Sequence, residues 1–162
     1  MSFSIEILSA QEMGVLGEAL GKDLNRPAIV LLHGEMGAGK TRFVQGMAKA
    51  LNVQRLVTSP TFLTVKEYPT PDGKFIHCDL YRVFTEHYLE EVGVLDELER
   101  GAIVAVEWPR FQTIDLEVML VDVQIQKGDV ETSRLVVLDS VGSECQLSNV
   151  SIFSNTRSRA SK

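Results

Sequence analysis

Residues 34–41 have the sequence Gly34-Glu35-Met36-Gly37-Ala38-Gly39-Lys40-Thr41, which matches the pattern G-x-x-x-x-G-K-[ST] at every fixed position. Glycines let a backbone curl until several N–H groups point inward at one anion. A lysine at this place adds a point charge suited to the β- and γ-phosphates of a nucleotide, and the threonine hydroxyl suits magnesium. The stretch therefore predicts a phosphate-binding loop.

The segments on either side of the loop support this interpretation. Residues 28–32 form a continuous apolar run, which is typical of a strand buried on both faces. After the loop, apolar residues keep helical spacing over about 40–51. Strand, loop and helix in this order bring the positive helix N-terminus to the anion. We therefore predict that the nucleotide is bound by Glu35, Met36, Gly37, Ala38, Gly39, Lys40, Thr41 and Arg42.

A magnesium-dependent site of this class also needs a carboxylate at the end of a neighbouring strand. Asp79 follows the extended stretch 75–78, and Glu107 follows the apolar stretch 102–106. We predict that Thr41, Asp79 and Glu107 hold the metal, and that Lys40, Asp79 and Glu107 are the catalytic residues. The alternatives are a helix cap or an ion pair with Arg82 for Asp79, and a solvated strand end for Glu107.

Two more segments are candidates for the nucleotide site. Thr58-Ser59-Pro60-Thr61 follows a short strand expected at Val57, at a place where a hydroxyl can respond to the metal or the γ-phosphate. A plain structural turn is the alternative. Trp108 directly follows Glu107 and either covers the nucleotide or packs in the core. We count Thr61 and Trp108 among the nucleotide-binding candidates.

The rest of the chain predicts an α/β fold with a mixed, largely parallel sheet, helices on both faces and a C-terminal antiparallel hairpin. Helices are expected over 10–20 and, with a break near Gly93, over 85–100. Strands are expected over 62–68, 74–78, 116–125 and 134–138. Residues 1–141 would form the ATPase domain of P-loop type. The last 21 residues, 142–162, contain six serines and are expected to be a disordered polar tail.

Composition narrows the class of protein. A chain of 162 residues with 44% hydrophobic residues is about one domain with one sizeable core. The net charge of −6 disfavours a free-standing nucleic-acid binder. Two cysteines imply no disulfide framework and a reducing compartment, so a cytoplasmic location is expected. No apolar run approaches the ~20 residues that span a bilayer, so no membrane partner is expected.

Four segments in this order carry a resemblance to a known family: Leu32–Thr41, Ser59–Phe62, His77–Arg82 and Glu107–Pro109. In the order and spacing of these four segments, the chain resembles the TsaE family (also called YjeE) over roughly residues 7–140. These are small bacterial P-loop ATPases of tRNA threonylcarbamoyladenosine synthesis. Cys78 departs from the family pattern, where phenylalanine is frequent. The tail has no counterpart.

The resemblance implies a function and its partners. ATP and Mg²⁺ are the implied ligands, with Asp79 and Glu107 at the magnesium or its water, Trp108 near the nucleotide and Ser59–Thr61 as a switch-like segment. The family's enzyme is implied to hydrolyse ATP weakly alone and faster with the TsaD and TsaB proteins. Hydrolysis would drive assembly or resetting of the TsaD–TsaB complex that modifies adenosine 37. Contact with tRNA is then only indirect.

Other functions stay open at this point. A small-molecule kinase would consume ATP only with an acceptor, and a nucleotide-dependent binding switch would need no useful catalysis. A nucleic-acid-binding accessory protein is disfavoured by the net charge. No Asn-Lys-x-Asp sequence follows the loop, which favours ATP over GTP.

Overall fold

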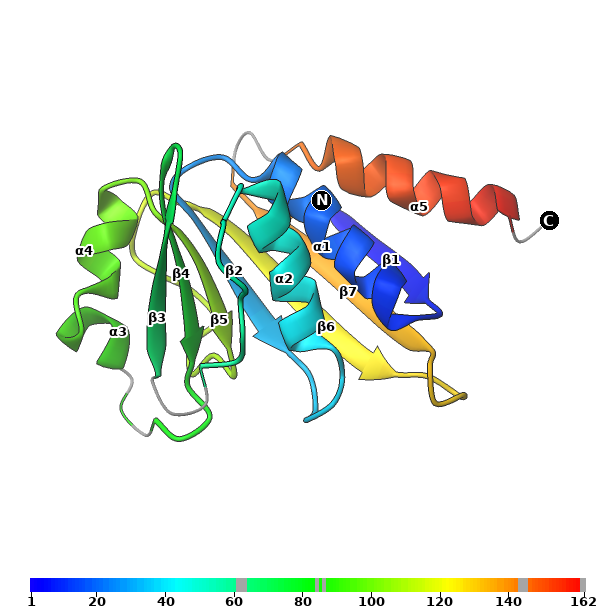
Figure 1. Ribbon diagram of the computed structural model, residues 1–162, viewed down its shortest axis with the longest axis horizontal. Coiled ribbons are helices and arrows are strands. Elements are labelled where there is room, and N and C mark those ends of the chain that lie inside the picture. Colours follow the sequence, from blue (N-terminus) through cyan, green and yellow to red (C-terminus); the bar gives the residue numbers. More distant parts are fainter. Residues whose placement is uncertain (61–63, 84, 86, 143–145, 161–162) are drawn as a thin grey trace.

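Seven strands form one mixed sheet in the part of the chain that the computed structural model describes, residues 1–60, 64–83, 85, 87–142 and 146–160 (Figure 1). Their order across the sheet is β1-β7-β6-β2-β5-β4-β3. The strands are β1 (Ser2–Ile7), β2 (Ala28–His33), β3 (Val65–Thr70), β4 (Gly73–Asp79), β5 (Ile103–Glu107), β6 (Met119–Lys127) and β7 (Arg134–Val141).

The four central strands of the sheet are parallel. β2 pairs in parallel with β5 and with β6, and β5 pairs in parallel with β4. The outer pairs β3–β4, β6–β7 and β1–β7 are antiparallel. The predicted mixed sheet and its C-terminal hairpin are therefore confirmed, with the parallel part confined to the centre. Parallel strands end at the same edge of a sheet, and that edge is where ligands bind in open α/β folds.

Helices cover both faces of the sheet, as predicted. The helices are α1 (Ala10–Asp23), α2 (Lys40–Ala50), α3 (Tyr88–Glu91), α4 (Val94–Glu99) and α5 (Ser148–Ala160). Alternate residues of β2 enter two separate apolar clusters: Val30 and Leu32 pack with α1 and α2, whereas Ile29 and Leu31 pack with α3 and α4. Burial on both faces explains why β2 is a continuous apolar run rather than an alternating one.

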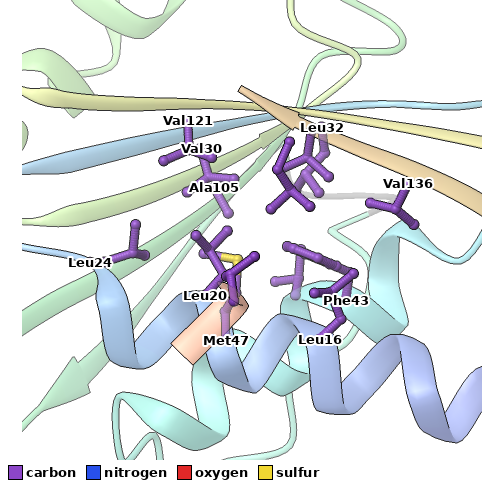
Figure 2. Packing of buried hydrophobic residues seen from close by; sticks show 14 of the residues in the cluster. Leu16, Leu20, Leu24, Val30, Leu32, Phe43, Met47, Ala105, Val121 and Val136 are labelled. Atoms are coloured by element: carbon purple, nitrogen blue, oxygen red, sulfur yellow. The ribbon is translucent and has the colours of Figure 1, made fainter. Parts of the chain in front are cut away.

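The larger cluster fixes the two helices that flank the phosphate-binding loop. Leu16 of α1 and Phe43 and Met47 of α2 are fully buried, and Figure 2 shows them packed beneath Val30 and Leu32 of β2. Truncating a buried phenylalanine to alanine typically costs about 3–5 kcal/mol of stability. These contacts thus hold the start of α2 at a set place beside the end of β2.

Close backbone approach between α1 and α2 depends on two glycines. A Cβ added at Gly17 would lie 2.1 Å from the carbonyl oxygen of Phe43, and one added at Gly46 would lie 2.0 Å from that of Gly14. Both distances are far below van der Waals contact. The position of α2 relative to α1 therefore requires glycine at both places.

Two elements differ from the sequence-based expectation. The structure has no strand at Val57, which lies buried in an irregular segment where its carbonyl oxygen accepts a hydrogen bond from Gln45 Nε2 at 2.9 Å. The Gln45 side chain thus satisfies a carbonyl group that would otherwise need a neighbouring strand. β1 was not expected, and it forms by antiparallel pairing with β7, with Ile5 and Ile7 turned into the core.

The expectation of a disordered tail is wrong for residues 148–160, which form α5. Leu147 and Val150 are buried in the larger apolar cluster. The carboxylate of Asp23, at the end of α1, accepts hydrogen bonds from the backbone N–H of Asn149 and of Val150, both at 2.9 Å. A distant side chain thus caps the helix, and the composition of the tail gives no sign of that partner. Among the described residues, no helix is both long and apolar enough to cross a membrane.

We predict opposite effects of alanine at two glycines of α1. Gly17→Ala should lower the free energy of unfolding by roughly 1–3 kcal/mol, because the new Cβ would overlap Phe43. Gly14→Ala is the matched control, because its Cβ would meet nothing closer than 3.9 Å. It should raise the free energy of unfolding by up to about 1 kcal/mol through helix propensity. Urea denaturation measures both, and equal values for the two variants would contradict the close packing.

Candidate functional site

A cavity of about 700 Å³ lies at the carboxyl ends of the central strands. One wall consists of residues 36–42, the second half of the loop and the start of α2. The lining also contains Asp79 at the end of β4 and Glu107 at the end of β5, together with Tyr81 and Trp108. Residues that follow three separate strands, β2, β4 and β5, therefore converge here, because these strands are parallel and adjacent.

The loop backbone suits an anion. Gly37 and Gly39 have φ angles of 79° and 109°, a region that other residues rarely adopt. Gly39 is the N-cap of α2 and gives it no side-chain cap, and the first turn of the helix holds no acidic residue. The N–H groups at the start of α2 thus face the cavity as the positive end of the helix, which attracts phosphate.

Lys40 brings a buried positive charge to the same place. Its ammonium donates hydrogen bonds to the carbonyl oxygens of Gly34 and, at 3.3 Å, of Glu35. The ammonium lies 4.0 Å from the centre of the Trp108 ring, within the range of a cation–π contact. Burial lowers the pKa of Lys40, while the carboxylates of Glu107 and Asp79 act in the opposite direction.

The two carboxylates predicted at the metal lie side by side. Asp79 and Glu107 are register partners on the parallel strands β4 and β5. Asp79 is half-buried, and its Oδ1 accepts a hydrogen bond from the N–H of Tyr81 at 2.9 Å. Glu107 is only 3% exposed, so it is not a solvated strand end. Both carboxylates line the cavity. Glu107 is the more buried acceptor, and Asp79 is the more accessible one.

His77 is a site residue that sequence reasoning missed. It is fully buried, and its Nε2 lies 2.6 Å from Oε2 of Glu107. Its Nδ1 has no hydrogen-bond partner among the described residues. Donation from Nε2 to the carboxylate holds the Glu107 side chain in one orientation. Only the pairing of β4 with β5 brings the two together.

Trp108 both lines the cavity and packs, so the two alternatives for this residue do not exclude each other. Its backbone is left-handed, with φ of 53°, and its N–H bonds to the carbonyl oxygen of Leu32 at 3.3 Å. Its ring lies 5.0 Å from the ring of Tyr81. Tyr81 was not expected at the site, and its two-residue distance from Asp79 is the signal that could have suggested it.

One predicted nucleotide-binding residue, Glu35, does not line the cavity, and another, Thr61, cannot be assigned to it. The Glu35 side chain is 82% exposed, lies 3.8 Å from Lys127 and is not part of the cavity lining. The backbone carbonyl oxygen of Glu35 contributes to the site by accepting a hydrogen bond from the Lys40 ammonium. Thr61 lies outside the described residues, although its neighbours Ser59 and Pro60 line the cavity. The remaining candidates of the loop, including Thr41 and Arg42, all line it.

The oxygen donors that line the cavity suit a hard cation that takes only some of its ligands from the protein. In the described part of the chain, no three or more His, Cys, Asp or Glu side chains gather closely enough to hold a metal. Thr41, Asp79 and Glu107 nevertheless offer hydroxyl and carboxylate oxygens to one cavity. Mg²⁺ prefers such ligands, keeps several waters and is completed by substrate phosphates. The chemistry of the donor set therefore fits magnesium.

Comparisons with known proteins agree with this geometry. Residues 7–136 match the model of the family described as threonylcarbamoyl adenosine biosynthesis protein TsaE. Proteins named tRNA threonylcarbamoyladenosine biosynthesis protein TsaE are similar to this chain. The one from Aquifex aeolicus is 43% identical over 62% of this chain and 71% of its own. The one from Streptomyces coelicolor is 30% identical over 87% of this chain and 99% of its own.

A solved structure shares the fold. The crystal structure of YdiB from Bacillus subtilis has a TM-score of 0.70 and covers all of this chain and 97% of its own, at 19% sequence identity. At this identity the likeness concerns the fold alone. The topology described above is thus found in a second protein whose sequence has diverged widely.

We predict that His77 and Glu107 are coupled in stability. His77→Phe should lower the free energy of unfolding by roughly 2–4 kcal/mol, because the buried carboxylate loses its partner. Adding Glu107→Leu in the same chain should restore part of that loss, since both polar groups are then gone. Urea denaturation of the two single variants and the double variant measures the coupling. Strictly additive changes would contradict the pairing.

Proposed function

The chain belongs to the TsaE family of threonylcarbamoyl adenosine biosynthesis proteins, and from this premise we propose that it is an ATPase of tRNA threonylcarbamoyladenosine biosynthesis. One observation carries the proposal: an uncapped helix N-terminus, one buried ammonium and two carboxylates meet in one cavity of about 700 Å³. The family match covers all of these groups, because residues 7–136 include the whole cavity lining.

In this proposal the loop and α2 bind the triphosphate of ATP. The N–H groups of Gly37 and of residues 39–41 supply the donors, and the helix N-terminus adds its positive end. Lys40 supplies charge to the phosphate oxygens. Its ammonium is already held at the loop by the carbonyl oxygens of Gly34 and Glu35. A preorganised charge of this kind stabilises the negative charge that develops during phosphoryl transfer.

The carboxylates complete the proposed reaction. Thr41, Asp79 and Glu107 would hold Mg²⁺, which when bound neutralises charge on the phosphate oxygens. A carboxylate of Asp79 or Glu107 orients the water that attacks the γ-phosphate. Glu107 is suited to this task because His77 fixes its orientation in a buried place. The products are ADP and inorganic phosphate.

We predict that Lys40→Ala weakens ATP affinity at least about ten-fold, because a charge-assisted contact to phosphate is lost. Lys49→Ala is the matched control. Lys49 lies on the same helix, is 76% exposed and pairs with Glu18 at 3.5 Å, away from the cavity. Isothermal titration calorimetry with ATP and Mg²⁺ measures both variants. Wild-type affinity in Lys40→Ala would rule out the proposed nucleotide site.

We further propose that hydrolysis is slow in the isolated protein and faster with the TsaD and TsaB proteins, whose complex it would assemble or reset. Arg42 and Arg82 line the cavity but are exposed, and neither side chain has a hydrogen bond or ion pair with the described residues. Neither guanidinium is therefore held in place for catalysis. A positioned arginine adds ~10³–10⁵ in rate in related chemistry, so a partner that orders one would accelerate the reaction.

Turnover measurements test the role of the partners. Phosphate release by this protein should rise at least about ten-fold on adding TsaD and TsaB, because a partner that positions catalytic groups lowers the barrier. Lys40→Ala with the same partners is the control and should release no phosphate above background. Equal rates with and without the partners would contradict the partner dependence while leaving ATP binding intact.

A further inference from the structure

One arginine outside the cavity joins the phosphate-binding loop to the β6–β7 turn. Arg134 is the first residue of β7. Its Nε donates to the carbonyl oxygen of Ala38 at 3.0 Å, and its Nη2 donates to that of Gly37 at 3.2 Å. Its Nη1 donates to the carbonyl oxygens of Glu131 at 2.6 Å and Ser133 at 2.7 Å, both in the turn. One guanidinium therefore holds together two segments that lie 96 residues apart.

The bond from Arg134 to Ala38 determines which way the N–H of Gly39 points. A trans peptide is planar, so its C=O and its N–H point in nearly opposite directions. The carbonyl of Ala38 points to Arg134, so the N–H of Gly39 in the same peptide points away from it. Arg134 is absent from the cavity lining, whereas Gly39 is part of it. The guanidinium thus lies behind the loop, on the side away from the cavity.

The loop needs such a support because its own sequence leaves it free to move. Gly37 and Gly39 flank Ala38, and glycine has more conformational freedom than any other residue. The second contact from the same hairpin is weak: Lys127 lies 3.8 Å from Glu35, and both side chains are largely exposed. Arg134, which bonds to two consecutive carbonyl groups, is therefore the stronger tie between hairpin and loop.

We propose that Arg134 is a positioning residue for phosphate binding. It holds the carbonyl groups of Gly37 and Ala38 behind the loop. The N–H of Gly39 then stays directed at the anion, while the N–H of Ala38 donates to the carbonyl oxygen of Glu35 at 3.0 Å and closes the turn of the loop. The inference rests on the proposed function for its ligand and adds a residue that does not touch that ligand. Arginine suits this position because its planar fork donates to four carbonyl oxygens in two segments, whereas a lysine ammonium has only three N–H donors, all on one atom.

Arg26 provides a matched control. It also uses a guanidinium to bridge backbone groups, donating from Nη1 to the carbonyl oxygens of Lys74 at 3.0 Å and Gly101 at 3.1 Å. Its Nη2 donates to Oγ1 of Thr70 at 2.8 Å. None of these residues lines the cavity. Replacing Arg26 therefore removes a comparable set of hydrogen bonds without touching the loop.

The test compares Arg134→Met, Arg134→Lys and Arg26→Met with the wild-type protein. Isothermal titration with ATP and Mg²⁺ should show about ten-fold weaker binding for Arg134→Met, since two hydrogen bonds that orient the loop are lost. Arg134→Lys should recover only part of this loss. Arg26→Met should bind within about two-fold of wild type, while its thermal midpoint falls about as far as that of Arg134→Met.

A second measurement does not depend on the nucleotide. Hydrogen exchange of the amides of residues 36–41 should be faster in Arg134→Met and Arg134→Lys than in wild type, and unchanged in Arg26→Met. Wild-type exchange in both Arg134 variants would overturn the inference, as would equal losses of ATP affinity in Arg134→Met and Arg26→Met. If the wild-type protein failed to bind ATP, the proposed function would fall, and the exchange data would still decide whether Arg134 orders the loop.

Discussion

The placement of α2 is the constraint on which the rest of the structure depends. The helix begins at Lys40, directly after the loop, and two of its apolar residues are locked beneath β2. Glycines at 17 and 46 let α1 approach it at backbone distance. Because protein interiors are close-packed, a shift of α2 would have to displace both β2 and α1. The start of the helix therefore stays at the edge where the parallel strands end.

Polar groups gather at that edge at a cost to stability. Lys40, His77 and Glu107 are nearly inaccessible to solvent, and each has a specific partner. Burying charged groups stabilises a fold little or not at all compared with apolar residues of similar size. Where a protein departs from the usual rules of core composition, a functional site is the common reason. The buried charges thus point to chemistry at this cavity rather than to folding.

Two contacts at long range extend the framework beyond the motif. Arg134 supports the loop from the β6–β7 hairpin, and Asp23 caps α5. The family match ends at residue 136, so it includes Arg134 and leaves out α5, which packs on α1. The loop support therefore belongs to the part of the chain that matches the family model, and the last helix lies outside that match.

Local patterns in the sequence determined the loop, the strand and helix that flank it, and the position of Asp79 and Glu107 at strand ends, because each of these depends on neighbours within a few positions. The tertiary structure alone decided that His77 bonds to Glu107, that Arg134 holds the loop and that the polar tail becomes a helix. These partners lie 30, 96 and 126 residues apart. They meet only once strand order and register are set, and nothing in a local window of sequence encodes that meeting.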